Sequence, residues 1–305
     1  MERRKLSDKI PVSNVTERSV RMERVTLKNG VKMPQIGFGV LQLKDVELCE
    51  SCVGTALQSG YRMVDTASAY FNEAAVGNAV KQSGIPREEV FLISKLWIQD
   101  SSFEKTKQAL EHTLGELGTD YLDLYLIHHP FGDYYDAWRA METLYEEGKV
   151  RAIGVSNFDE ARLTDLCLNS RIAPMVDQIE LHPFHQQEHM LRVMMEYQVT
   201  AQAWAPFCEG QKMIFEHKEF EKIAKKYHKT AAQVILRWNI ERGVSVLPGS
   251  SDAAHIHENM DIWDFELSNG DKRIIEQLDL GYSEIIDHNS ACTARWLNEW
   301  KIHET

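Results

Sequence analysis

The sequence predicts an α/β protein built as a closed (β/α)8 TIM barrel. Eight short apolar runs recur along the chain, and longer amphipathic stretches of helical period separate them. No change of composition and no flexible linker interrupts this alternation. Eight repeated strand–helix units favour a closed barrel over an open doubly wound sheet. We therefore expect one barrel domain over residues 25–305, preceded by a polar extension of residues 1–24.

Composition narrows the class of protein. A length of 305 residues fits one large barrel or two ordinary domains, so length alone does not choose. The chain is 43% hydrophobic and 26% charged, and its apolar runs are too short to span a bilayer, which indicates a globular protein with no membrane partner. The net charge of -12 argues against a nucleic-acid partner. Five thinly spread cysteines fit a reducing cytoplasm, and we expect a monomer or weak dimer.

The first elements are an extension and a hairpin. Residues 1–22 are polar and charged, with no hydrophobic stretch after Arg3 and Arg4, so we interpret them as a loosely ordered extension and not a targeting sequence. Residues 25–33 form two short apolar runs around Asn29-Gly30, the strongest local hairpin signal.

The repeating units follow from residue 35 onward. The predicted strands are Gln35–Phe38, Tyr61–Val64, Val90–Ser94, Tyr121–Ile127, Val150–Gly154, Met175–Gln178, Val199–Ala203 and Val244–Leu247. The clearest predicted helices between them are Phe103–Leu117, Tyr135–Glu147, Glu188–Tyr197 and Thr230–Glu241.

Polar residues follow three of these strands. Asp65 ends the second, with Tyr70 five residues later, Lys95 follows the third and His128 follows the fourth. The C-terminal ends of the strands in a parallel barrel converge on one face, where catalytic groups collect. We therefore expect these four side chains to form one cluster.

The residue types of this cluster suggest its chemistry. A free tyrosine, with a pKa of about 10, is a poor acid near neutrality. A lysine ammonium beside the phenol lowers that pKa, and Asp65 is placed to hold Lys95 charged. His128 would orient a carbonyl group by hydrogen bonding. The set contains no strong nucleophile, so it suits proton donation to a developing alkoxide, which requires a hydride source. Considered alone, Tyr70 could equally be a half-buried structural tyrosine, and Lys95 a surface lysine.

The same residues resemble a known family. Asp65–Tyr70, Ser94–Trp97 and Ile127–Pro130 resemble the Asp-Tyr-Lys-His tetrad of the aldo-keto reductases, and the resemblance runs from about Val25 to the C-terminus. It continues through the segments Met33–Gly39, Gly148–Phe158, Gln178–Pro183 and Glu258–Asn259. The resemblance implies an NAD(P)H-dependent oxidoreductase with Tyr70 as general acid, a hairpin that caps the barrel bottom and a C-terminal tail over the active-site face. The short loop at 207–213 is similar to that of the microbial, diketogluconate-reductase-like branch, which favours small aldehydes, dicarbonyls or keto-sugars.

The resemblance also implies a cofactor site, although the sequence lacks the G-x-G-x-x-G fingerprint of dinucleotide-binding folds. Residues implied to hold the nicotinamide carboxamide are Ser156, Asn157 and Gln178, and Trp204 would stack on the ring. Residues implied at the adenosine end are Ser250, His255, Glu258 and Asn259. Simple core packing is the alternative for Trp204.

Two positions depart from the family pattern at the adenosine end. Gly249 stands where NADPH-preferring members usually carry lysine, and His255 stands at the arginine position. Both cations normally pair with the 2′-phosphate of NADPH. NADP(H) remains the expected cofactor, with NAD(H) preference or dual use as an alternative hypothesis.

Other assignments stay open. Candidates for the wall of the substrate pocket are Leu41, Trp97, His129, Phe131 and Trp296, the last in a tail that also contains Trp300. Packing of the tail onto the barrel is the alternative for the two tail tryptophans. A metal site at His128 and His129 is disfavoured because neighbouring side chains on a strand point to opposite faces. A metal-dependent barrel hydrolase and a non-catalytic nicotinamide-binding sensor remain the rival hypotheses.

Overall fold

The structure, a computed structural model, describes residues 23–304, so the predicted extension lies almost entirely outside the described residues. Its main feature is a parallel sheet whose eight strands follow one another in chain order. The strands are β3 (Phe38–Gly39), β4 (Met63–Asp65), β5 (Phe91–Leu96), β6 (Leu124–Ile127), β7 (Ile153–Ser156), β8 (Val176–Glu180), β9 (Thr200–Trp204) and β10 (Ser245–Val246). A parallel bridge between Ile36 and Val246 joins the first strand region to the last and closes the ring. The predicted TIM-barrel-like fold is confirmed.

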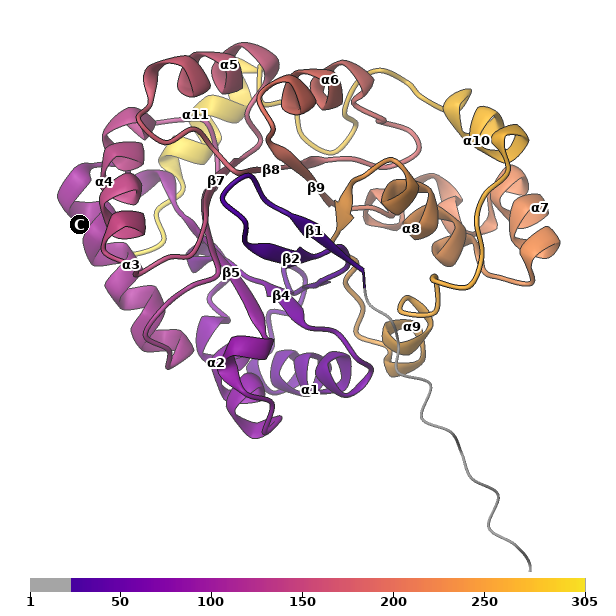
Figure 1. The fold of residues 1–305 in the computed structure, drawn as a ribbon, viewed down its shortest axis with the longest axis horizontal. Helices are drawn as coiled ribbons and strands as arrows, with labels where there is room; N and C mark the ends of the chain where they lie inside the picture. The colour runs from indigo at the N-terminus through magenta and orange to yellow at the C-terminus, as the bar shows by residue number, and fades with distance from the viewer. Residues whose placement is uncertain (1–22, 305) are drawn as a thin grey trace, which may run out of the picture.

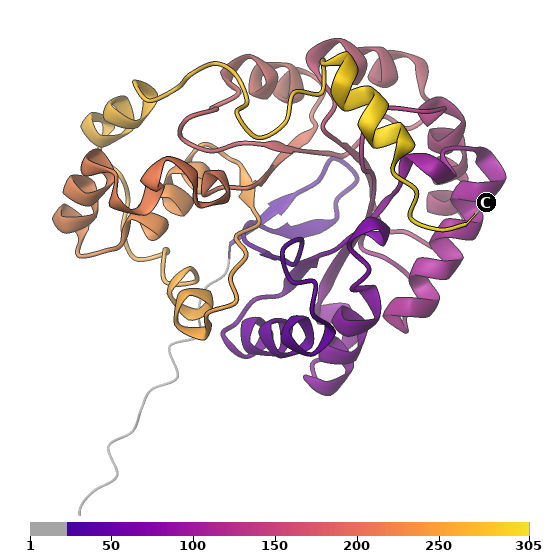
Figure 2. The same cartoon turned by 180° about the vertical axis from the view of Figure 1, so that it is seen from behind.

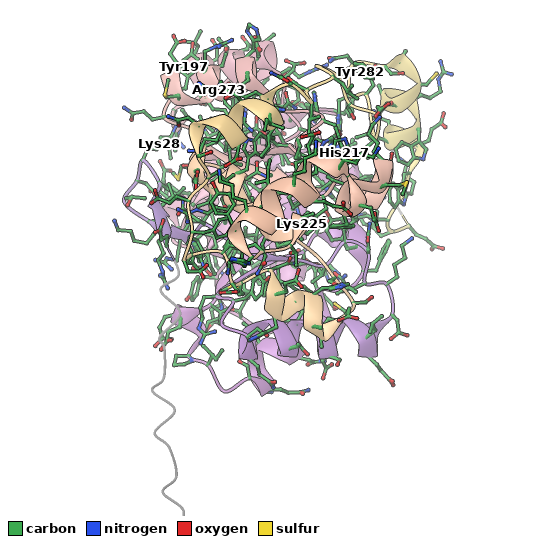
Figure 3. All side chains as sticks on the ribbon, turned by 90° about the vertical axis from the view of Figure 1, so that its right-hand side faces the viewer. Lys28, Tyr197, His217, Lys225, Arg273 and Tyr282 are labelled. Carbon is green, nitrogen blue, oxygen red and sulfur yellow. The ribbon has the colours of Figure 1, made fainter. Side chains whose placement is uncertain are left out.

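Helices surround this sheet as a ring (Figure 1). They are α1 (Val46–Gln58), α2 (Glu73–Gln82), α3 (Phe103–Leu117), α4 (Tyr134–Glu146), α5 (Glu160–Asn169), α6 (Glu188–Glu196), α7 (Lys218–Tyr227), α8 (Ala231–Glu241), α9 (Ala253–Glu258), α10 (Asn269–Glu276) and α11 (Ala291–Glu299). Figure 3 views the side covered by α7, α8 and α10, where Lys225 and Arg273 are exposed on the outer surface. Within residues 23–304, no helix has the length and apolar character needed to cross a bilayer.

Local sequence explains where several helices begin and how closely they pack. The Asp45 side chain accepts a hydrogen bond from the Leu48 amide at the start of α1, and Thr230 forms a capping box with Gln233 at the start of α8. In α2, a β-carbon at Gly77 would lie 2.4 Å from a backbone oxygen of α3. Glycine therefore permits the close contact of these two helices.

The predicted hairpin is present as β1 (Arg24–Thr26) and β2 (Lys32–Pro34), which pair antiparallel. Gly30 takes a positive φ of 88° in the connecting turn, a conformation that suits glycine. In Figure 1 the hairpin crosses the middle of the ring on the near side, whereas Figure 2 shows α11 on the opposite side. The side chain of Met33 is buried and lies 3.8 Å from Gln202 Nε2, so the hairpin contacts the barrel interior.

Strand limits differ from the predictions by a few residues. Asp65, Lys95 and Ser156 belong to their strands, where the sequence placed them after or at the strand ends. Conversely, the first predicted strand is regular only at residues 38–39, because residues 35–37 lie at the closure of the barrel, where they pair with β10. Residues at the strand ends carry polar side chains because they face the mouth of the barrel. Loop residues are polar too, so the sequence does not show where the strand stops.

Candidate active site

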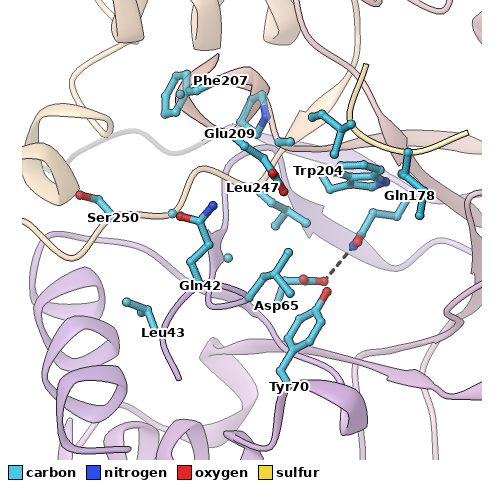
Figure 4. Close-up of a pocket in the computed structure, with 18 of the residues that line it drawn as sticks. Gln42, Leu43, Asp65, Tyr70, Gln178, Trp204, Phe207, Glu209, Leu247 and Ser250 are labelled. Carbon is cyan, nitrogen blue, oxygen red and sulfur yellow. Dashed lines mark hydrogen bonds between the residues drawn. The ribbon is translucent and has the colours of Figure 1, made fainter. Parts of the chain in front are cut away.

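One cavity of about 1180 Å³ opens at the C-terminal ends of the strands. In Figure 4, Asp65 and Tyr70 lie in its middle, with Trp204 and Gln178 on one side and Ser250 on the other. Its walls come from strand ends, from η4 (Cys208–Glu216), from α9 and from α11. A single cavity therefore joins the predicted catalytic cluster to both predicted binding ends.

The predicted tetrad is assembled at the floor of this cavity. The fully buried Lys95 Nζ lies 2.6 Å from Asp65 Oδ1 and 3.4 Å from Tyr70 Oη. It also donates to the Thr66 carbonyl at 2.9 Å. On the other side of the phenol, Tyr70 Oη lies 3.5 Å from His128 Nε2. The four side chains predicted to cluster thus form one connected chain.

Burial controls the electrostatics of the tetrad. It raises the pKa of Tyr70 well above its usual value, with the Asp65 charge adding to the effect. It also lowers the pKa of Lys95, an effect that Asp65 opposes. We expected Lys95 to lower the pKa of the Tyr70 phenol, and this expectation is wrong, because the pKa is raised. The physical reason is that the phenol is desolvated and that Asp65, 2.6 Å from the Lys95 ammonium, offsets the lysine charge.

Gln178 is tied into the tetrad. Its Nε2 donates to Asp65 Oδ2 at 2.8 Å, the dashed line in Figure 4, and to Gln202 Oε1 at 2.8 Å. Both amide protons are therefore engaged, which leaves Oε1 as the atom available to a ligand. Ser156 Oγ donates to the Gln178 carbonyl at 2.8 Å. The side chains of Ser156 and Gln178 thus line the cavity, and Gln178 also holds the Asp65 carboxylate in place.

Asn157 links the tetrad to Trp204. It adopts a positive φ of 64°, which asparagine tolerates better than most residues. Its Oδ1 accepts from Trp204 Nε1 at 2.8 Å, and its Nδ2 donates to the His128 carbonyl at 3.0 Å. The half-buried Trp204 lines the cavity, and Asn157 ties its ring to the backbone of His128.

The predicted adenosine-end residues also line the cavity: Ser250, His255, Glu258 and Asn259. Among the described residues that line it there is no lysine and no arginine. At position 249 there is also little room for a side chain, because a β-carbon there would lie 2.7 Å from the Gly39 carbonyl oxygen. Position 249 therefore accommodates glycine where the family pattern has a cation.

The opposite end of the cavity is aromatic. Trp97, Trp296 and Trp300 line it, as Leu41 and His129 also do. Trp97 Nε1 donates to the Trp300 carbonyl at 2.9 Å, and the two rings meet edge-on at 5.0 Å. Trp300 thus packs on the barrel, and both tail tryptophans line the cavity. Phe131 departs from the prediction: it is absent from the described cavity lining, and its ring stacks near His288 at 6.4 Å.

His128 and His129 do not point to opposite faces, as strand alternation led us to expect. Their rings are stacked, with centroids 4.6 Å apart and planes inclined by 8°. Strand β6 ends at Ile127, so the alternation no longer applies to the two histidines. Both side chains line the cavity.

Several cavity residues escaped sequence reasoning. They are mainly Gln42, Leu43, Leu48, Glu209, Phe215, Ile285, Ile286, Asp287 and Leu297. Glu209 follows β9 and was detectable as an acid beyond a strand end. His288, whose Nε2 lies 3.0 Å from His129 Nδ1, carried no signal, because it is a lone histidine in a polar segment.

Comparisons with known proteins agree with this geometry. The model of the family described as "Aldo/keto reductase family" matches residues 35–280. The chain is 44% identical over 257 residues to glyoxal reductase of Bacillus subtilis (strain 168), covering 84% of this chain and 92% of that protein. It is 43% identical over 256 residues to 9,11-endoperoxide prostaglandin H2 reductase of Trypanosoma cruzi (strain CL Brener), covering 83% and 90%. The crystal structure of a Bombyx mori aldo-keto reductase in complex with NADP superposes with a TM-score of 0.83 at 30% identity, covering 87% and 95%.

Proposed function

Because this chain belongs to the aldo/keto reductase family, whose members use NADP(H), we propose that it reduces small aldehydes, dicarbonyls or keto-sugars with Tyr70 as the general acid. The observation that carries the proposal is the chain of contacts from Asp65 through Lys95 to Tyr70 Oη at the floor of the cavity. A non-catalytic sensor on the same barrel would have no use for this arrangement.

The residues along the cavity fit a nicotinamide dinucleotide. The Trp204 ring offers a flat apolar surface, Gln178 Oε1 is free to accept a hydrogen bond, and the cavity continues to Asn259. When bound, the cofactor supplies the hydride. The chain's own residues then position the substrate carbonyl and supply its proton.

Tyr70 is placed to donate that proton. Its raised pKa keeps the phenol protonated, so that Oη carries a proton when the substrate binds. As negative charge develops on the substrate oxygen, the phenol releases its proton, and the Lys95 ammonium at 3.4 Å stabilises the resulting phenolate. Asp65 and Gln178 hold Lys95 in position.

His128 acts as a neutral hydrogen-bond donor. Burial lowers its pKa well below the usual value, with His129 and Lys95 adding to the effect. Its Nδ1 is buried and has no partner among the described residues, whereas Nε2 faces Tyr70. An unpaired buried N–H costs more than an unpaired acceptor, so the proton resides on Nε2. From there it points at the position of the substrate carbonyl oxygen.

Charge indicates which substrates and cofactors suit the cavity. With no lysine or arginine among the described lining residues, and with Asp287 at the rim, the cavity favours uncharged carbonyl compounds over keto acids. The glyoxal reductase relative, by its name, acts on a small uncharged dicarbonyl. The same lack of cations around Gly249 supports the use of NADH as well as NADPH. We also propose that the β1–β2 hairpin closes the bottom of the barrel. The tail with α11 would cover the end of the cavity that is lined by Trp97, Trp296 and Trp300.

The test follows the loss of NADPH absorbance, and separately of NADH absorbance, with a panel of simple aldehydes and dicarbonyls. Oxidation of either cofactor supports the reductase, and the ratio between the two reports the state of the 2′-phosphate site. Binding of both cofactors without any oxidation would overturn the catalytic proposal in favour of the sensor.

A further inference from the structure

A histidine pair beside the catalytic centre has no role in the mechanism above. His129 follows β6, and His288 lies just before α11, yet His129 Nδ1 and His288 Nε2 are 3.0 Å apart. His129 is 8% exposed, and its ring is stacked on the ring of His128. The pair therefore joins the C-terminal segment to the catalytic histidine.

Neighbouring hydrogen bonds determine which nitrogen of His129 carries the proton. Trp204 Nε1 is only a donor, so the atom of Asn157 that it meets at 2.8 Å is the acceptor oxygen. Asn157 Nδ2 consequently faces His129 Nδ1, at 3.4 Å. An amide nitrogen is only a donor, and its two protons also face the His128 carbonyl at 3.0 Å and Ser156 Oγ at 3.1 Å. Its proximity to His129 Nδ1 favours the tautomer in which Nδ1 is an acceptor. His288 Nε2–H then donates to it as well, and the proton of His129 resides on Nε2.

The protonated nitrogen of His129 is free. Within residues 23–304, Nε2 of His129 makes no hydrogen bond, and it is not among the buried polar atoms that lack a partner. His129 lines the cavity, so this N–H faces the space that the substrate enters. Burial, together with the neighbouring His288, lowers the pKa of His129 well below its usual value, so the ring is a neutral donor at physiological pH.

Two parallel imidazoles therefore present donors to one cavity. The His128 donor serves the reacting carbonyl oxygen, and the His129 ring is stacked at 4.6 Å from it. Rings at this separation lie side by side at the cavity wall, so a substrate with oxygen atoms on adjacent carbons has one imidazole available for each oxygen.

We propose that His129, oriented by His288, is a specificity residue that binds the oxygen on the carbon next to the reacting carbonyl. The substrate class selected in this way is the vicinal dicarbonyls and α-hydroxycarbonyls. A site with a polar group aimed at such an oxygen discriminates against analogues without it, because the donor is then left unpaired. This inference rests on the proposed reductase function, since it concerns a second contact with the same substrate.

His288 is a positioning residue in this arrangement. It touches no reacting atom, but its N–H holds His129 Nδ1 as an acceptor and so keeps the other nitrogen protonated. A glutamine at this position offers a similar neutral donor, whereas alanine offers none.

The experiment compares methylglyoxal with propanal, which has the same three-carbon chain without the second oxygen, in the full-length protein. The variants are His129→Phe, which keeps a stacked ring but removes the donor, together with His288→Ala and His288→Gln. For each substrate, kcat/KM of a variant is divided by that of the wild type, so that differences in intrinsic reactivity and hydration cancel. Phenylglyoxal and phenylacetaldehyde provide a second pair, and circular dichroism checks the fold of each variant.

We expect His129→Phe to lower the relative kcat/KM for methylglyoxal about five- to tenfold more than that for propanal, which is the effect of one hydrogen bond. His288→Ala should reproduce part of the selective loss, and His288→Gln should restore it. An equal loss for both substrates, or no loss for either, would overturn the role of His129 while leaving the reductase intact. Inactivity of the wild type toward all four compounds, with either cofactor, would overturn the proposed function itself, and the inference with it.

Discussion

The carbonyl oxygen of Gly39 lies so close to Gly249 that a β-carbon at position 249 would come within 2.7 Å of it. Gly39 ends β3, and Gly249 follows β10, so the contact occurs where the barrel closes. The Gly39 amide also donates to the Pro248 carbonyl at 3.1 Å, which keeps the two segments together. The absence of a cation at position 249 is thus coupled to backbone packing.

Adding a methyl group should disturb this closure. We expect Gly249→Ala to destabilise the protein by about 1–3 kcal/mol, because a backbone atom has to move. Gly115→Ala is the matched control: a β-carbon there meets no atom within 4 Å, and alanine is favoured by about 0.5–1 kcal/mol within a helix such as α3. Thermal unfolding should show a lower Tm for the first variant and a higher Tm for the second. A Tm for Gly249→Ala equal to that of the wild type would contradict this prediction, because it would show that the backbone at Gly39 shifts without a measurable loss of stability.

A cation can be supplied at His255, which is exposed and lines the cavity. We expect His255→Arg to tighten NADPH binding about tenfold, since a charge-assisted contact to a phosphate contributes about 1.5 kcal/mol or more. NADH has no 2′-phosphate and should bind with unchanged affinity. Fluorescence titration of both cofactors measures the two dissociation constants. A gain shared equally by NADH would argue against a 2′-phosphate site at this position.

Removing the acid should stop the reaction without emptying the site. We expect Tyr70→Phe to reduce kcat by about 100-fold or more, because general acid catalysis is lost while the ring is retained. The dissociation constant for NADPH should change little. Tyr282→Phe, at a tyrosine that is 58% exposed, controls for loss of a phenol elsewhere. Retained turnover in Tyr70→Phe would exclude this residue as the acid.

Asp177 offers a test of stability against pH. It is fully buried, and neither carboxylate oxygen has a partner at hydrogen-bond geometry among the described residues. Burial raises its pKa well above the usual value, an effect that the nearby Phe158 backbone amide opposes only in part. The folded protein therefore binds a proton that the unfolded chain releases above a pH of about 4. This contribution to stability is complete below that pH and is lost as the pH rises through the folded-state pKa.

Replacing the acid by its neutral isostere should remove that loss. We expect Asp177→Asn to be more stable than the wild type at pH 7, with the difference shrinking toward pH 4. The difference should grow by about 1.4 kcal/mol for each pH unit between pH 4 and the folded-state pKa. Urea unfolding from pH 4 to 8 measures it, and the exposed Asp120→Asn is the control. A constant difference across this range would contradict the proton uptake.

Much of the site could be predicted because its residues adjoin regular elements. Asp65, Lys95 and His128 each end or follow a predicted strand, and a parallel barrel gathers such positions at one mouth. Strand limits were less accurate, since a polar residue at a strand end has the same composition as a loop. The opposed directions assigned to His128 and His129 were wrong for the same reason.

Local periodicity and turn chemistry were sufficient to predict the eight repeated units, the hairpin at Asn29-Gly30 and the strand ends that carry the tetrad. Three other features appear only in the folded chain: the contact of His288 with His129, the approach of Gly39 to Gly249 and the burial that raises the pKa of Tyr70. These features depend on how segments far apart in the chain pack around one cavity. Contact and desolvation are properties of that packing, and no local pattern of residues encodes them.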